Sequence, residues 1–202
     1  MKRTFILIFF SLVTIVSSAQ SGLFDIISVD RIEDDGRRQV MADDLEMRFD
    51  GAKYSITLKA YSNGESVDWA LLFSSFYYIP DNAIVLIKLK DETVMEFPVN
   101  NVNVGSIALP ARSYTIGSTI MTEPSREQDY YSAYFVISPE QMDTIVSKRV
   151  SKIRITTNAT YEYRENTIGA FQLGYYIQSA RNAIEKRLSV PSKGKAKIWD
   201  NF

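Results

Sequence analysis

The chain contains no cysteine, so no disulfide bond can hold its fold together. Small exported domains often depend on such cross-links, because they bury too little apolar surface without them. A chain of 202 residues has the length of one ordinary domain and must instead be held by a hydrophobic core. The patterning of its apolar residues is therefore the best guide to its fold.

The first residues have the composition of an export signal. A short basic stretch is followed by an apolar run over 5–16, and small residues precede Ala19 and Gln20. The run is well short of the ~20 apolar residues that span a bilayer, and it ends as a signal peptidase requires. We expect a signal peptide over 1–19, cleaved between Ala19 and Gln20. The mature protein is then periplasmic or secreted, without membrane insertion, and the lack of cysteine favours the bacterial envelope.

The first half of the chain shows the patterns of antiparallel strands. Alternating or continuous apolar runs occupy residues 45–49, 54–60, 67–79, 83–89 and 94–97. Asn63-Gly64 can fill the two left-handed positions of a tight hairpin turn. The run over 67–79 is apolar on both faces, which is typical of a central strand covered on both sides. These patterns predict an antiparallel meander, followed by weaker strand patterns over 104–109 and 114–121 and a strong aromatic strand over 129–137.

Two helices are expected in the last third of the chain. Ser138-Pro139-Glu140-Gln141 is typical of a capped helix start. A second helix is expected over 167–188, with an apolar stripe of Leu173, Ile177, Ala180, Ile184 and Leu188. The order of elements predicts an α+β fold: an antiparallel sheet or meander with a short helix and a long C-terminal amphipathic helix packed on it. We expect this single domain over 20–190 and a basic, flexible tail over 191–202.

The segment from Tyr130 to Thr157 combines an aromatic strand, the S-P-E-Q helix start, a short helix and a K-I-R-I strand. This order resembles a pattern in small exported proteins of unknown function from Gram-negative envelopes. The resemblance implies a fold tendency and no activity, so it assigns no functional residue.

The chain also contains no histidine. Together with the lack of cysteine, this removes the imidazole base, the thiolate nucleophile and the usual zinc and copper ligands. A formal net charge of −1 provides no long-range field for nucleic acid. The acidic cluster Glu33-Asp34-Asp35-Gly36 is expected to be a solvated turn, because Arg31 stands where a calcium loop needs a ligand. We therefore expect no catalytic, cofactor-binding or metal-binding residues, no cofactor and no nucleic-acid partner.

Two functions remain open from the residues alone. The first is an exported, non-catalytic binding or accessory protein of the bacterial envelope, with an unknown protein or carbohydrate partner. The alternative is a carbohydrate-active enzyme that works through carboxylates, of which Glu162 and Glu165, beside Tyr161 and Tyr163, are the candidates. A cleft holding two carboxylates favours the enzyme, whereas a tyrosine platform or an exposed apolar patch favours the binding protein.

Overall fold

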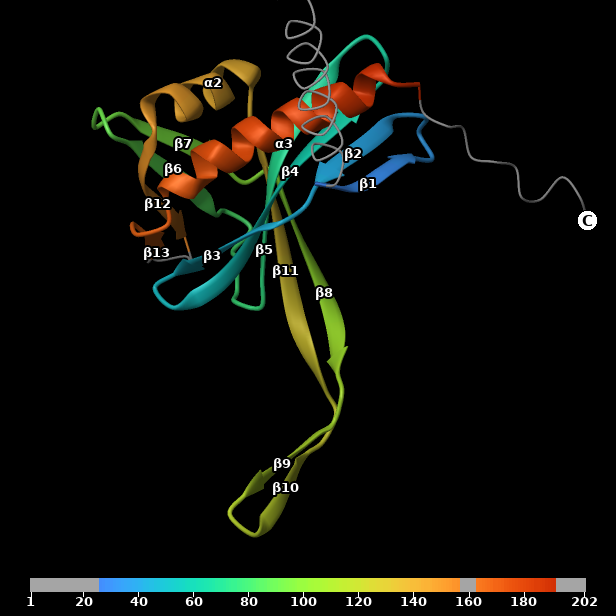
Figure 1. The fold of residues 1–202 in the computed structure, drawn as a ribbon, viewed down its shortest axis with the longest axis vertical. Helices are drawn as coiled ribbons and strands as arrows, with labels where there is room; N and C mark the ends of the chain where they lie inside the picture. The colour runs from blue at the N-terminus through green and yellow to red at the C-terminus, as the bar shows by residue number, and fades with distance from the viewer. Residues whose placement is uncertain (1–25, 157–162, 192–202) are drawn as a thin grey trace, which may run out of the picture.

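The computed structural model describes residues 26–156 and 163–191 (Figure 1). The expected signal peptide, its cleavage site between Ala19 and Gln20, and the basic tail beyond Pro191 lie outside these residues. Within the described part of the chain, no helix is long and apolar enough to cross a membrane.

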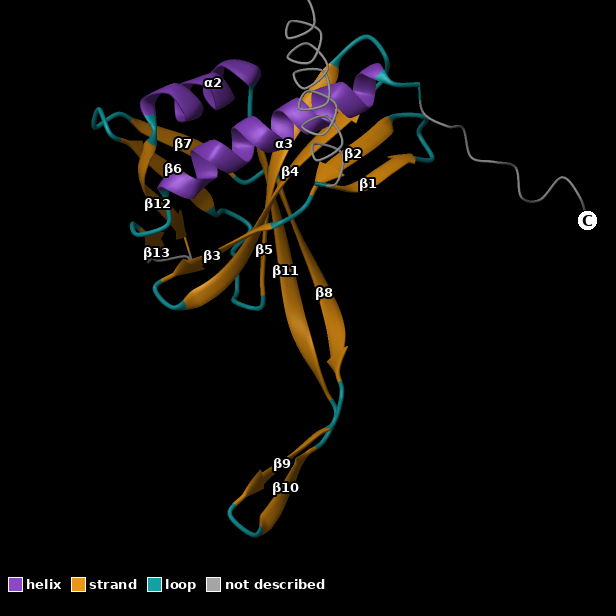
Figure 2. Ribbon diagram, viewed as in Figure 1, coloured by secondary structure: helices purple, strands orange, loops and turns teal. Residues whose placement is uncertain are grey.

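A seven-stranded antiparallel sheet makes up the larger part of the fold (Figures 1 and 2). Its strands are β1 (Ile27–Ile32), β2 (Arg38–Ala42), β3 (Leu45–Phe49), β4 (Ala52–Ser62), β5 (Val67–Ser75), β8 (Asn101–Leu109) and β11 (Arg126–Val136). The strand order is β1-β2-β4-β5-β11-β8, and β3 pairs with the first half of β4 while β2 pairs with the second half.

A second, four-stranded sheet lies beside the first, in the order β13-β12-β6-β7. Its strands are β6 (Ile84–Leu89), β7 (Val94–Pro98), β12 (Val150–Thr156) and β13 (Tyr163–Asn166), and the helices are α2 (Pro139–Lys148) and α3 (Phe171–Ser189). Helix α3 contacts β2 and β4 of the large sheet, β12 of the small sheet, and α2 (Figure 2). The helix therefore joins both sheets around one core.

The α+β class expected from the sequence is wrong. Strands take up 55% and helices 18% of the described residues, and the large antiparallel sheet curls into a half-barrel. The single meander is also wrong, because β6 pairs with β12 instead of β5, and β11 takes the place beside β5. Much of the additional strand content lies over 101–126, where side chains are exposed on both faces and show little alternation.

Local expectations met different outcomes. The Ser138 cap is confirmed: the Gln141 amide donates to the Ser138 hydroxyl at 3.2 Å, and the Ser138 amide donates to the Gln141 side chain at 2.8 Å. The Asn63-Gly64 turn is wrong as a two-residue loop, because Ser62 pairs with Val67 and the loop spans four residues. Only Gly64 of that pair has a positive φ, and the Asn63 side chain accepts bonds from the amides that follow it.

Helix α3 begins at Phe171, later than the expected residue 167. The Asn166 side chain accepts a bond from the Gly169 amide at 3.1 Å, which holds a turn in front of the helix. The apolar stripe of the helix is fully buried from Leu173 to Ile184, and Leu188 is partly buried against the same core. The expected packing of this stripe is thus present although the fold class differs.

Tyr176 on α3 compensates for a gap in the large sheet. Because β2 begins pairing at Lys59 and β3 ends its pairing at Ile56, two residues of β4 have no strand partner on that edge. The Leu58 amide donates instead to the Tyr176 hydroxyl at 2.7 Å, which donates to the Asp43 carbonyl at 2.9 Å. Burial raises the pKa of Tyr176, so the hydroxyl stays protonated and keeps both bonds.

Asp30 ties the end of α3 to the first hairpin. Its carboxylate accepts two hydrogen bonds from Arg38, at 2.8 and 2.9 Å, and a further one from Arg187. Arg38 in turn donates to the Val190 carbonyl at 2.6 Å. The Arg38 guanidinium, with that of Arg187, holds the pKa of Asp30 below its ordinary value.

Candidate functional site

A two-stranded arm projects from the large sheet (Figure 1). Strand β8 pairs with β11 along its whole length, from Asn101 opposite Tyr134 to Leu109 opposite Arg126. β5 pairs only with residues 131–136 of β11, so the outer part of the arm has no third strand among the described residues. Strands β9 (Arg112–Ile116) and β10 (Thr119–Glu123) continue it to the tip.

Pro110 and Pro124 separate the two parts of the arm. They fall on opposite strands, between the last pair of β8 and β11 and the first pair of β9 and β10. Proline has no amide proton to donate, so the ladder is interrupted on both strands at the same level. The ribbon changes direction there, as Figure 2 shows.

The tip is a tight hairpin around Gly117. Ile116 pairs with Thr119, and of the two loop residues only Gly117 has a positive φ, of 62°. A positive φ at the first loop position alone is the type II′ turn, which favours glycine there. The single strand expected over 114–121 is therefore wrong, because Gly117 reverses the chain in its middle.

Large apolar side chains are exposed along the arm. They are between 39% and 72% exposed and comprise Val104, Ile107, Tyr114, Ile116, Ile120 and Met121. Tyr114 lies opposite Met121, and Ile116 is two residues from Tyr114, so these three share one face of the tip. A two-stranded ribbon cannot bury such side chains by itself and has little independent stability in water.

A tyrosine-lined groove lies on the face of the large sheet that is turned away from the hydrophobic core. Alternation along β4 places Lys59 and Tyr61 on the face opposite Leu58 and Ala60, which pack into the core. Two adjoining cavities, of about 780 and 460 Å³, share Arg37, Tyr61 and Tyr134 as lining residues. We call these two cavities together the polar groove. The larger cavity is also lined by Trp69, Asp68, Asn101, Asn103, Ser138 and Gln141.

Lys59 is a buried cation in the wall of this groove. The residue is 5% exposed, and its ammonium nitrogen lies 4.5 Å from the centre of the Tyr61 ring and 5.0 Å from that of Tyr134. The salt bridges within the described ranges give Lys59 no carboxylate partner. Burial lowers its pKa, although the Tyr134 hydroxyl acts in the opposite direction. The sequence pattern made Lys59 an ordinary outward residue of a half-buried strand, and it gave no sign of this burial.

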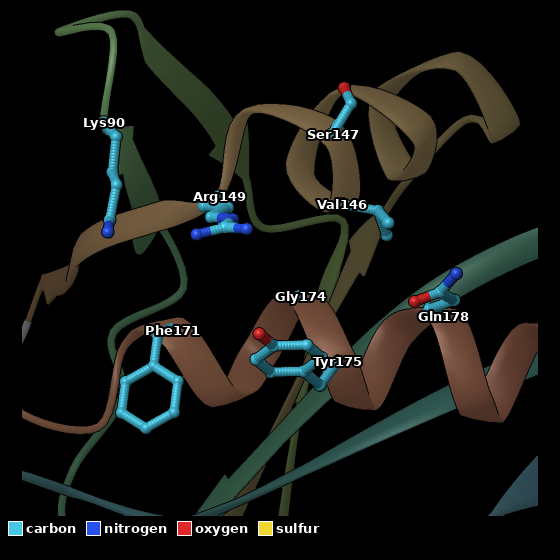
Figure 3. A pocket seen from close by; sticks show the side chains of 8 residues that line it. All are labelled: Lys90, Val146, Ser147, Arg149, Phe171, Gly174, Tyr175 and Gln178. Carbon is cyan, nitrogen blue, oxygen red and sulfur yellow. The ribbon is translucent and has the colours of Figure 1, made fainter.

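A smaller cavity of about 340 Å³ lies between the end of α2 and the start of α3 (Figure 3). Lys90 and Arg149 lie on one side of it, and Phe171 and Tyr175 lie on α3, with ring centres 6.4 Å apart. Both cations and both rings are exposed to solvent, and no carboxylate lines the cavity. The cavity therefore lacks an acid–base pair.

The carboxylates proposed for an enzyme do not form a cleft in the described residues. Glu165 accepts hydrogen bonds from Lys152 at 3.2 Å and from Arg154 at 2.9 Å, and these cations, Lys152 first, lower its pKa. A carboxylate held ionised in this way is a poor general acid. Glu162 and Tyr161 lie outside the described residues, so the pair cannot be placed together.

The acidic cluster at Glu33 forms the exposed turn between β1 and β2. Glu33 pairs with Arg31 at 2.9 Å, and Asp35 pairs with Arg37 at 2.7 Å. Within the described residues, no group of three acidic side chains is arranged to hold a metal ion. The cluster thus serves as a charged rim beside the polar groove, which its residues partly line.

Comparison of the chain with family models, curated proteins and solved structures finds no match. The resemblance of residues 130–157 to small envelope proteins accordingly stays a prediction. Sequence reasoning missed both the arm and the polar groove. One signal for the arm was present, because Pro110 and Pro124 stand at equal distances from Gly117, as expected for a hairpin with matched breaks.

Proposed function

We propose that this chain is an exported, non-catalytic protein of the bacterial envelope that binds another protein through its arm. The observation that carries the proposal is the set of exposed apolar side chains on a ribbon that the rest of the fold does not support. Isolated exposed apolar residues are ordinary, but a group of them on a projecting element is typical of an interaction site. The expected signal peptide supports export of the chain to the envelope.

The architecture separates binding from folding. The core lies between the sheets and α3. The outer part of the arm, residues 105–130, adds no buried apolar residue to that core. Ordering the backbone of a projecting segment of this length costs conformational entropy. Binding to a partner offsets that cost, because the partner buries the apolar face of the tip and can pair with the free edges of the ribbon.

The carbohydrate-active enzyme is the weaker candidate. It requires two carboxylates facing each other across a cleft. Glu165 is committed to Lys152 and Arg154, and the polar groove contains Asp68 without a second carboxylate across from it in the larger cavity. The available geometry therefore gives more support to a binding protein.

Site-specific photo-crosslinking in the producing bacterium tests the proposal. A photoreactive residue at Ile116, at the tip, should yield a discrete adduct with another envelope protein. The matched control is Val94, an apolar residue of β7 that is 51% exposed but lies away from the arm. Absence of an adduct at Ile116, or the same adducts at both positions, contradicts the proposal. An adduct of twice the chain's own mass contradicts the choice of another protein as the partner.

A further inference from the structure

Lys59 is an unusual residue to find buried without a counter-charge. Transfer of an ammonium group out of water is costly, and buried lysines are normally paired or deprotonated. The two tyrosine rings stabilise the cation through their faces, but even desolvated cation–π contacts offset only part of such a cost. A fold that needed only packing at this position would be served better by an apolar side chain.

Two of the three cations that line the groove are already paired, and the carboxylates Asp34 and Asp68 also line it. Arg31 is bound to Glu33, and Arg37 is bound to Asp35. Lys59 is therefore the cation of the groove wall that still lacks a carboxylate among the described residues. An incoming anionic group next to it would gain a charge-assisted hydrogen bond in a poorly hydrated place.

The remaining lining has a different chemistry. Tyr61 and Tyr134 offer ring faces and hydroxyl groups, and Asn101, Asn103 and Gln141 offer side-chain amides. Amides both donate and accept, which suits the hydroxyl groups of a sugar, and aromatic faces pack against the apolar side of a sugar ring. The larger cavity, at about 780 Å³, falls in the size range of small-ligand sites.

We propose that the polar groove binds an acidic sugar, a uronic-acid oligosaccharide, with one carboxylate on Lys59 and the ring hydroxyls on the amides and tyrosines. The site lies at the base of the arm, away from its tip, and does not depend on the function proposed for the tip. The groove binds and has no catalytic role in this assignment.

Isothermal titration of the exported protein with uronic-acid trisaccharides tests the assignment. Three acidic probes are used, made of galacturonate, glucuronate or mannuronate, together with the neutral trisaccharide that corresponds to each. At least one acidic probe should bind roughly tenfold or more tightly than its neutral counterpart, because only the acid pairs with Lys59. Failure of all three acids to bind, or equal binding of acid and neutral sugar, overturns the assignment.

Lys59→Met supplies the decisive variant. The change removes a buried charge and keeps most of the length of the side chain, so the variant should melt at the same temperature or higher while its affinity for the acid falls roughly tenfold or more. Lys53→Met is the control, since Lys53 lies on the same strand but is exposed and paired with Glu46. Unchanged affinity in Lys59→Met overturns the assignment. A chain without the arm tip should bind the sugar normally, which keeps this test independent of the arm.

Discussion

Asp30 shows how single residues fix this fold without covalent cross-links. Its carboxylate joins Arg38 at the start of β2 to Arg187 at the end of α3, and it is largely shielded from solvent. An ion pair on the surface contributes little, but removing one partner from a shielded, bidentate cluster leaves charge without compensation. The contact should therefore matter for the stability of the whole chain.

The cluster predicts a specific dependence of stability on pH. Because the arginines lower the pKa of Asp30 in the folded state, its contribution is present above about pH 4, the unfolded value, and is lost as the pH falls through the folded value. Asp30→Asn should lower the free energy of unfolding at pH 7 by about 2 kcal/mol or more and should flatten its decline below pH 5. Urea unfolding between pH 7 and pH 3 measures both.

The control for this experiment is Asp35→Asn. Asp35 also has a lowered pKa, through its bonds to Arg37, but it lies exposed in the β1–β2 turn. Its replacement should leave the free energy of unfolding almost unchanged, because an exposed ion pair contributes little. Equal effects of the two substitutions would show that the link to α3 does not stabilise the fold.

Helix α3 is the element on which the two sheets depend. Its stripe reaches β2 and β4 on one side and β12 on the other, and α2 packs against the helix near Gly174. Helix α3 contacts β12 of the four-stranded sheet, and direct contacts of β13 with β3 and of β7 with β11 also join the two sheets. The loss of α3 packing should therefore weaken the junction between the sheets.

Ile177→Asp tests the packing of α3. Ile177 is fully buried, so the change places a charge in an apolar contact and should cost about 3 kcal/mol or more. The expected product is insoluble or rapidly degraded by protease, whereas Ser179→Asp on the exposed face should behave as the unmodified chain. Thermal melting and limited proteolysis compare the two. An Ile177→Asp protein that melts at the original temperature would show that the stripe does not hold the sheets.

For the whole molecule, local sequence signals predicted elements better than their assembly. The alternation in β4, the Ser138 cap and the α3 stripe each depend on neighbours in the chain, and all three were visible in the sequence. The pairing of β6 with β12 depends on residues far apart in the sequence, so the meander was the simpler but wrong interpretation. The α+β class was inferred from the assumed strand pairing, so the wrong pairing also gave the wrong fold class.

The candidate sites were still harder to foresee. The arm has few buried residues, so it lacks the alternation from which strands are recognised. Lys59 occupies an outward position of β4, and its ammonium group lies against the rings of Tyr61 on the same strand and Tyr134 on β11. A tyrosine platform was considered from the sequence as a sign of a binding protein, but the sequence did not show which tyrosines share a face.

The central claim is that the arm serves binding and is dispensable for folding. The most direct measurement replaces residues 110–125 with Asn-Gly, which can close a two-residue turn between Leu109 and Arg126. A photoreactive residue at Ile107, exposed on the retained part of the arm, reports on the partner in both chains. We predict that the adduct formed at Ile107 in the full-length arm disappears in the shortened one, with a melting temperature within about 3 °C of the original. An adduct of undiminished yield, or a shortened chain that no longer folds, would contradict the claim.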